Sequence, residues 1–387
     1  MRAYWLRALP RRTLKTDLPE NNYFGCLCLL FLLLYRKARI QHQQKRRREL
    51  SRTCEGKMKQ SEQPLVTVIL TVFNQDQYLG ETLNSVFYQT YPLIQLIVVD
   101  NASTDKSLRI VEQFRQRAPA FQVITNTYNA GLCRAFNQGL ELAQGKYVID
   151  LSGDDILVPE RIERQVACFE SLSEEYAVVF SNAQYIDQAG RKLNDHYPVN
   201  QQGKTLTQVP SGDVYKKILE RYFICTPTMM MRKEALTQLG GYDESLLFED
   251  FDFWVRSAVK FKYHYQDEIL TKKRVVPASL STKVYQKNSG MLASYYTVCN
   301  KAYDLNRDQQ EFDILARRIR TFIRKCLYAQ EYELALRFRR LLNYIENPGW
   351  QTELIVLLCR LHLPLNFAYR FYIKNLKKAF RQEGFSF

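Results

Sequence analysis

The chain has 387 residues, and 55 lysine and arginine residues against 40 acidic ones give it a formal net charge of +15 at pH 7. The excess lies in the flanks, since residues 1–57 hold 14 basic and 4 acidic residues and residues 311–387 hold 14 and 7. The segment between them is nearly neutral and has no aromatic RNA-binding signature, which argues against a nucleic-acid-binding function. The four histidines lack zinc-site spacing, and nine scattered cysteines do not resemble a disulfide framework, so a reducing, cytoplasmic compartment is favoured.

The N-terminal flank contains one apolar run, residues 23–35, which is shorter than the roughly 20 residues that cross a bilayer. Basic residues follow this run, where a signal peptide would have a small-residue cleavage site. Because Met58 stands just ahead of the first predicted strand, we interpret residues 1–57 as an over-extended start. A short membrane anchor is the alternative.

Three apolar, β-branched runs between residues 65 and 150 predict buried parallel strands of an α/β fold. The carboxyl ends of such strands meet at one edge of the sheet, where open α/β sheets bind their ligands. We therefore expect the residues that follow the three runs to share one crevice. These residues are Thr71, Phe73 and Asn74, then Asp100 and Asn101, then Asp154 and Asp155.

Six motifs in this order resemble those of the family 2 glycosyltransferases, and the match covers about residues 64–275. Six ordered motifs are far more specific than any one of them. The resemblance implies the GT-A fold, a Rossmann-like mixed sheet flanked by helices and found in nucleotide-diphospho-sugar transferases. The motifs occupy residues 71–74, 99–105, 129–145, 154–155, 240–244 and 249–254.

The acidic pair Asp154 and Asp155 predicts a metal site. A sugar diphosphate leaves poorly as a bare anion, and hard carboxylate oxygens can hold the divalent cation that neutralises it. We expect Asp155 to be the main protein ligand of Mn²⁺ or Mg²⁺, and Asp154 to face the sugar, because Ser152 occupies the position where the family often has a first aspartate. The other interpretation is a solvated turn, or the cap of a helix that begins near residue 159.

The second strand end is predicted to bind the nucleotide. Asp100 and Asn101 are placed to contact uracil and ribose, and the resemblance puts the base near Asn101 and Thr71. Residues 103–105 also fit the capping pattern of a helix predicted over residues 106–117. Arg134 is a candidate for a phosphate contact, with a surface role as the alternative.

An inverting displacement requires a base that takes the proton from the acceptor hydroxyl. The resemblance assigns this role to Asp250, which lies among aromatic residues that raise the pKa of a carboxylate and can stack on a sugar. Glu249 and Asp252 are the rival candidates. The alternative for Asp252 is an acidic residue that stabilises a helix N-terminus.

Beyond residue 280 the strand pattern stops and helical periodicity replaces it. The last predicted helix, residues 365–380, interleaves aromatic and basic residues, as a helix on an anionic membrane surface does. Packing as an ordinary terminal helix is the alternative. The preceding predicted helices are residues 294–305, 312–329, 331–343 and 352–361.

We therefore predict a basic extension at residues 1–57, a GT-A glycosyltransferase domain at residues 58–280 and a C-terminal helical region at residues 281–387. The hypothesis is a metal-dependent enzyme that moves a hexosyl or N-acetylhexosaminyl group from a nucleotide sugar, a UDP-sugar by preference, to a glycan or lipid-linked acceptor. Its setting would be cell-surface polysaccharide synthesis, in the cytoplasm or on the cytoplasmic face of the inner membrane. The alternative is a non-catalytic nucleotide-sugar-binding or scaffold protein, or a nucleotidyltransferase on the same fold.

Overall fold

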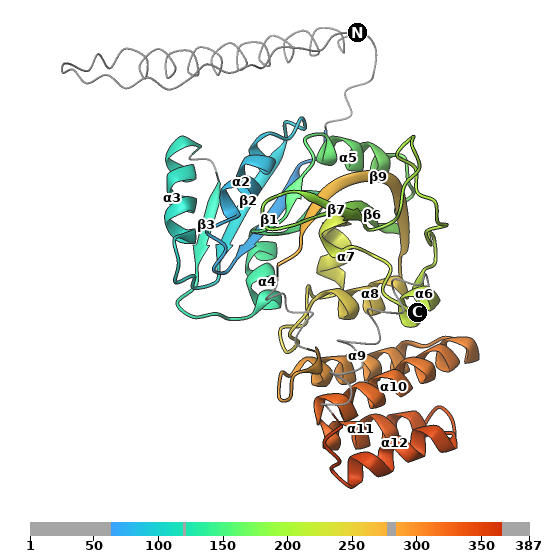
Figure 1. The fold of residues 1–387 in the computed structure, drawn as a ribbon. Coiled ribbons are helices and arrows are strands. Elements are labelled where there is room, and N and C mark those ends of the chain that lie inside the picture. Colours follow the sequence, from blue (N-terminus) through green and yellow to red (C-terminus); the bar gives the residue numbers. More distant parts are fainter. Residues whose placement is uncertain (1–62, 119–120, 277–283, 366–387) are drawn as a thin grey trace, which may run out of the picture. The chain divides into compact units, whose positions relative to one another are not determined.

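The computed structural model describes residues 63–118, 121–276 and 284–365 (Figure 1). The strands and helices of these residues all belong to one compact unit that begins at Pro64. The predicted extension at residues 1–57 and nearly all of the predicted helix at residues 365–380 lie outside the described part.

The described strands form one mixed sheet in the order β3-β2-β1-β4-β8-β6-β9-β5, with β7 paired to β6. Strands β3, β2, β1 and β4 are parallel, whereas β8 runs antiparallel to both β4 and β6. The strands are β1 (Val66–Val72), β2 (Ile94–Asp100), β3 (Gln122–Thr125), β4 (Tyr147–Ser152), β5 (Ile156–Leu157), β6 (Tyr176–Ile186), β7 (Lys192–Asp195), β8 (Met230–Arg232) and β9 (Lys262–Arg274).

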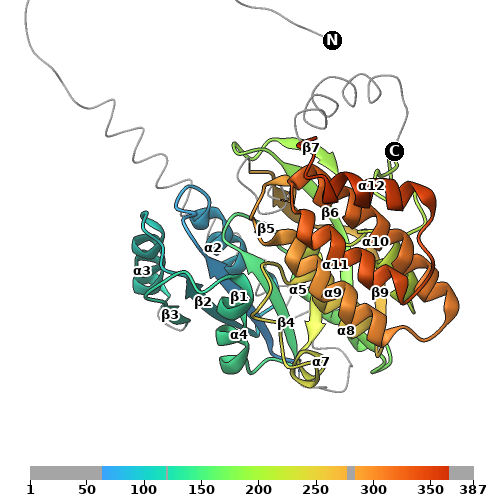
Figure 2. The same ribbon diagram turned by 90° about the horizontal axis from the view of Figure 1, so that it is seen from below.

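Helices flank the sheet, and a group of four follows it in sequence (Figures 1 and 2). The flanking helices are α2 (Leu79–Phe87), α3 (Ser107–Arg117), α4 (Leu132–Leu142), α5 (Arg161–Glu170), α6 (Tyr215–Glu220), the 3-10 helix η1 (Thr226–Thr228), α7 (Lys233–Gln238) and α8 (Asp250–Ala258). The C-terminal helices are α9 (Met291–Leu305), α10 (Gln309–Ala329), α11 (Tyr332–Asn343) and α12 (Trp350–Arg360). The predicted α/β architecture with a C-terminal helical region is confirmed.

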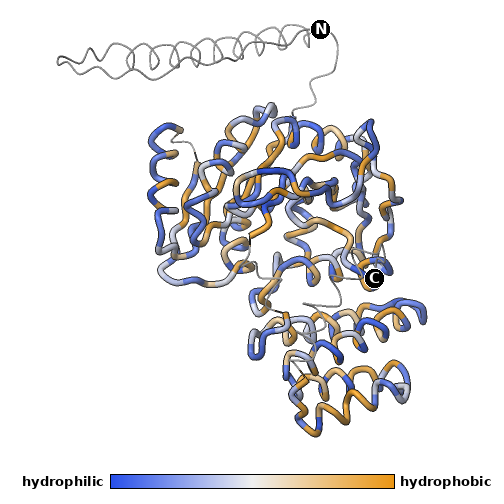
Figure 3. Tube along the Cα trace, viewed as in Figure 1, coloured by the Kyte–Doolittle hydropathy of each residue, from blue (hydrophilic) through white to orange (hydrophobic). Residues whose placement is uncertain are grey.

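The sheet is buried on both faces because successive side chains of a strand point to opposite sides. Along β1, Val66, Val68 and Leu70 face the core under α2, α3 and α5, whereas Ile69 joins the core under α4. The central strands β1, β2 and β4 are therefore apolar at most positions, and Figure 3 shows hydrophobic colour along the central sheet. Because β1, β2 and β4 are parallel neighbours, their carboxyl ends lie at the same edge of the sheet. The polar residues that follow these strands therefore come together at this edge.

Several predicted helix boundaries differ from the observed ones. Helix α10 begins at Gln309 and not at residue 312, because the Asp308 side chain accepts a hydrogen bond from the Glu311 N–H (3.0 Å). The helix predicted from residue 106 begins at Ser107.

None of the helices in the described ranges is both long enough and apolar enough to cross a membrane. The six cysteines within these ranges are free thiols.

Candidate active site

The loops after β1 and β2 are held together by Asn74, which has a positive φ of 53°. Its Oδ1 accepts a hydrogen bond from the Thr104 N–H (2.8 Å), and its own N–H donates to Ser103 Oγ (3.1 Å). Neither Ser103 nor Thr104 caps α3, contrary to the predicted pattern; Asp105 accepts from the N–H of Ser107, the first residue of that helix (2.9 Å). Asn74 thus ties together the loops that follow β1 and β2.

Asp100 lies at the end of β2 and is almost fully buried. Its Oδ2 accepts a hydrogen bond from the Ser103 N–H (3.1 Å), but its Oδ1 is buried without a partner. A buried carboxylate oxygen without a donor is costly and calls for an explanation. A nucleotide that offers an N–H or O–H at this position would satisfy it. Thr71, on the neighbouring strand β1, is likewise buried.

Asn101 is also buried, but its side chain is fully used within the protein. Its Nδ2 donates to Asn129 Oδ1 (2.9 Å) and to the Gly131 carbonyl (3.2 Å), and its Oδ1 accepts from Asn126 Nδ2 (3.1 Å) and the Ala130 N–H (2.9 Å). These four bonds exhaust the capacity of an amide. Asn101 therefore fixes the loop before α4, and its predicted contact with the base would require one of these bonds to break.

Two other predicted nucleotide-sugar residues are exposed. Phe73 follows β1 with 43% of its surface accessible, which leaves its ring free to face a ligand. Arg134 on α4 donates to the Tyr128 hydroxyl (3.2 Å) and lies 4.0 Å from Glu244. These exposed contacts fit the alternative interpretation, in which Arg134 has a surface role. An exposed ion pair of this kind contributes little to stability.

The acidic pair after β4 is fixed by Arg274, at the end of β9. The backbone N–H of Arg274 donates to Asp155 Oδ1 (3.0 Å), and its side-chain Nε donates to the Asp154 carbonyl (3.2 Å). Arg274 is itself buried and forms an ion pair with Glu81. Asp155 is 4% exposed, and the N-cap of α5 is Glu160, so the solvated-turn and helix-cap interpretations do not hold for Asp155.

The predicted role of Asp155 as a metal ligand can be compared with its surroundings. Burial raises the pKa of this carboxyl to about 7, the Asp154 charge adds to the rise, and the Lys273 ammonium opposes it. No group of three or more His, Cys, Asp or Glu side chains suited to a metal lies within the described residues. A Mg²⁺-type site needs only one or two carboxylates when substrate phosphates and water supply the other ligands. Asp155, with Asp154 beside it, fits such a site.

The two predicted base residues lie at the start of α8, with Glu249 at the N-cap and Asp250 in the first position. Burial raises the pKa of Asp250, while the Phe251 N–H and the charges of Lys273 and Arg318 oppose the rise. Burial and the charge of Asp250 hold the pKa of Glu249 well above its usual range. The charge of Lys273 opposes the rise in pKa at both Asp155, the predicted metal ligand, and Asp250, the predicted base.

Asp252, the third candidate base, is placed differently. It is buried, with Oδ2 on Arg256 Nε (2.7 Å) and Oδ1 on Lys301 Nζ (2.5 Å). Both of its oxygens are therefore neutralised inside the protein. This arrangement suits a structural role better than proton transfer.

Sequence reasoning missed three charged residues of this region, namely Asp150, Lys273 and Arg274. Asp150 lies on β4, where it accepts a hydrogen bond from the Tyr242 hydroxyl (3.1 Å), and burial raises its pKa to about 7. A carboxylate inside an apolar strand was a signal that could have found it. Lys273 and Arg274 gave no such signal, because their relation to Asp155 depends on the pairing of β9 with β5.

Comparisons with known proteins identify the family of this chain. The profile of Glycosyl transferase family 2 matches residues 67–240. An uncharacterized glycosyltransferase of Haemophilus influenzae is 31% identical over 225 residues, which are 58% of this chain and 84% of the relative. Another, of Methanocaldococcus jannaschii, is 29% identical over 256 residues, 62% of this chain and 84% of the relative.

Among solved structures, residues 1–349 of S. aureus TarS in complex with UDP-GlcNAc align with a TM-score of 0.55 and 17% identity, over 79% of this chain and 91% of that one. At this identity the likeness concerns the fold. The mixed sheet and its flanking helices have the GT-A fold. The chain belongs to glycosyl transferase family 2, as its motifs predicted.

Proposed function

We propose that this glycosyltransferase transfers a sugar from a UDP-sugar to a hydroxyl of its acceptor with inversion, and that it depends on a divalent metal. One observation carries the proposal: two carboxylates, the buried Asp155 and the half-buried Asp250, both have a raised pKa that the charge of the same lysine, Lys273, opposes. A nucleotide-binding or scaffold protein has no need of a second such carboxylate beyond the metal ligand. The pair suits a donor site and an acceptor site that adjoin.

The donor half of the site would use the strand ends of β1, β2 and β4. Asp100 has an unpartnered oxygen for a donor group of the nucleoside, and Thr71 lies on the adjacent strand. Asp155 would hold Mn²⁺ or Mg²⁺ with Asp154 beside it, and the bound cation would neutralise the charge that develops on the leaving diphosphate. The UDP-GlcNAc complex of TarS makes UDP-sugars the first donors to test, for hexosyl or N-acetylhexosaminyl transfer.

The acceptor half would use Asp250. In a single displacement the acceptor hydroxyl attacks the anomeric carbon opposite the leaving nucleotide, and Asp250 takes the hydroxyl proton. Its raised pKa makes it a stronger base than an exposed aspartate, while Lys273 and Arg318 oppose its protonation. The bond to the nucleotide breaks as the new glycosidic bond forms, so the configuration inverts.

Incubation of the purified protein with UDP-glucose, UDP-galactose, UDP-GlcNAc and GDP-mannose tests the proposal. We expect slow, Mn²⁺-dependent release of UDP from at least one UDP-sugar, with water as the acceptor. Failure of every nucleotide sugar to bind, measured by calorimetry with Mn²⁺, would contradict it.

We further propose that the acceptor belongs to cell-surface polysaccharide synthesis and reaches the enzyme at a membrane surface. In the described part of the chain, α12 and the residue after it expose an apolar stripe of Trp350, Leu354, Leu357 and Leu361, at helical spacing. The sequence beyond residue 365 adds five basic residues within 12 positions. A lipid-linked glycan on an anionic leaflet would suit both features.

Replacement of Lys374, Lys377, Lys378 and Arg381 by glutamine is therefore expected to weaken binding to vesicles that contain anionic phospholipid. Each cation near such a surface contributes about 1 kcal/mol, and salt screens the attraction. Co-sedimentation measures the effect. A matched control removes four exposed charges around α3, Lys106, Arg109, Arg115 and Arg117, and should bind like the wild type. If both variants bind equally well, or the wild type does not bind, the membrane proposal is wrong.

A further inference from the structure

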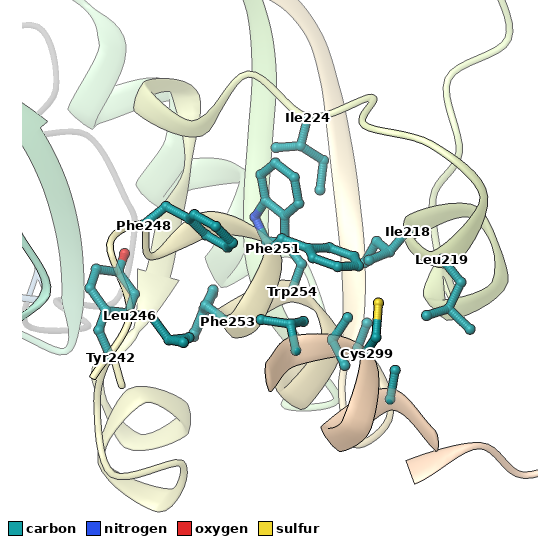
Figure 4. Packing of buried hydrophobic residues seen from close by; sticks show 14 of the residues in the cluster. Ile218, Leu219, Ile224, Tyr242, Leu246, Phe248, Phe251, Phe253, Trp254 and Cys299 are labelled. Atoms are coloured by element: carbon teal, nitrogen blue, oxygen red, sulfur yellow. The ribbon is translucent and has the colours of Figure 1, made fainter. Parts of the chain in front are cut away.

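The start of α8, which carries Asp250, is enclosed by helices on two sides. Figure 4 shows the Phe251 ring beside Ile218 of α6, with Cys299 of α9 close by in the same cluster of buried residues. The family profile ends at residue 240, so α8 and all the C-terminal helices lie beyond it. The C-terminal helical region is thus packed against the segment that holds the candidate base.

Arg318 of α10 makes the most specific contact in this region. Its guanidinium carbon lies 4.0 Å from the centre of the Phe251 ring and 4.8 Å from that of Tyr222. Its Nη1 donates to the carbonyls of Ile218 (3.0 Å) and Leu219 (2.9 Å), near the end of α6. One side chain therefore joins α10 to the end of α6 and to the residue next to Asp250.

Arg318 is also a buried cation that lacks a carboxylate partner among the described residues. It is 9% exposed, its Nε is buried without a hydrogen-bond acceptor, and no described acidic side chain forms an ion pair with it. A buried, unpaired charge is costly, so packing alone does not explain an arginine at this position. The carboxylate that its charge favours is Asp250, the residue before Phe251.

We infer that Arg318 is a positioning residue for the reaction: it fixes the first turn of α8 through Phe251 and supplies a positive charge that faces Asp250. The inference rests on the proposed function of Asp250 as the base. It assigns to the C-terminal helical region a part in catalysis, since α10 would complete the acceptor side of a site whose donor side is built from the sheet.

A pH profile separates this role from simple packing. The groups that face Asp250 are Glu249 of the same turn, Lys273 of β9, Tyr222 after α6, Tyr295 of α9 and Arg318. Loss of the Arg318 charge raises the pKa of Asp250, and a base works only when ionised. The rate of a variant without this charge should therefore fall most at low pH and recover partly as the pH rises.

Arg318→Met and Arg318→Lys test the inference, with Arg317→Met as the control because Arg317 is exposed on the same helix. We measure UDP release from the nucleotide sugar that the wild type hydrolyses fastest. Arg318→Met should lower kcat by up to about 100-fold, because the base is displaced, and should leave KM for the donor nearly unchanged. The acid limb of its pH profile should lie at higher pH than that of the wild type. Arg318→Lys should recover part of the rate and restore the acid limb, and Arg317→Met should behave like the wild type.

Two results would overturn the inference. One is a wild-type pH profile and kcat in folded Arg318→Met; the other is a loss of activity that merely follows the loss of folded protein. If Arg318→Met does not fold, Arg318→Gln takes its place, because it also removes the charge but can keep a hydrogen bond to the α6 carbonyls; a wild-type acid limb in folded Arg318→Gln would overturn the inference. Activity of Asp250→Asn would instead refute the base assignment itself, so the two failures are distinguishable.

Discussion

Asp250→Asn is expected to leave nucleotide-sugar binding intact and to lower the transfer rate by about 10²–10⁴-fold, the usual effect of losing a general base. The amide has the same shape as the carboxylate and can still accept the Phe251 N–H, so the start of α8 should be preserved. It cannot take a proton from the acceptor. Donor affinity measured by calorimetry, beside the rate of UDP release, separates binding from chemistry.

Asp252→Asn is the matched control for this prediction, and Glu249→Gln tests the rival base. Asp252→Asn should lower the melting temperature, because it removes a buried carboxylate that Arg256 and Lys301 both contact. A less than threefold fall in the rate of folded Asp250→Asn would contradict the assignment. Glu249 would then be the next candidate.

Asp155→Asn is expected to abolish the part of nucleotide affinity that depends on Mn²⁺, a loss of about tenfold or more in Kd. The amide oxygen can still accept the Arg274 N–H, so the local backbone should not change. What is lost is the charge that holds the cation. Titration of UDP with and without Mn²⁺ measures the effect, and an unchanged Mn²⁺-dependent affinity would refute Asp155 as the main ligand.

Asp155→Asn is also expected to raise the thermal stability of the metal-free protein, although it weakens nucleotide binding. Burial raises the pKa of Asp155 from its ordinary 3.8 to about 7, so the folded state binds more protons than the unfolded state between these values. Stability is therefore lost as the pH rises through this window, and the cost is fully present above it. Without divalent cations, Asp155→Asn should melt at a higher temperature than the wild type at pH 8, and this difference should nearly vanish near pH 4. Asp313→Asn, an exposed position on α10, should show no such change.

The parallel half of the fold was predictable because each of its strands has a recognisable local sequence pattern. β1 and β2 are continuous apolar runs that end in polar residues, and each observed strand overlaps the predicted one closely. β9 was not predictable in the same way. Its 13 residues, Lys262–Arg274, include many charged side chains and are mostly half-buried, so their strand character depends on pairing with β6 and β5. The division of the chain at residues 57 and 280 remains a prediction.

In the candidate site, too, local sequence motifs were predictable, whereas contacts between residues distant in sequence were not. The motifs predicted which segments carry Asp155 and Asp250, and the structure brings both near Lys273. The sequence could not indicate that the Asn101 amide is saturated by the loop before α4, since this depends on four partners between residues 126 and 131. The role of Arg318 could not be predicted either, because this residue lies 68 positions beyond Asp250 and nothing in the local sequence indicates its contact with α8.

The central claim is that this chain transfers a sugar with Asp155 and Asp250 in distinct roles, and analysis of products from one reaction tests it most directly. Wild type, Asp155→Asn and Asp250→Asn are incubated with the best UDP-sugar and Mn²⁺, and UDP, free sugar and pyrophosphate are quantified. We predict equal amounts of UDP and sugar from the wild type, and almost none from either variant, although Asp250→Asn still binds the donor. In a parallel incubation with UTP and a sugar 1-phosphate in place of the UDP-sugar, formation of a UDP-sugar and pyrophosphate would indicate a nucleotidyltransferase. Donor binding without any UDP release by the wild type, even with EDTA-reversible Mn²⁺ binding, would contradict the claim in favour of a non-catalytic nucleotide-sugar-binding protein.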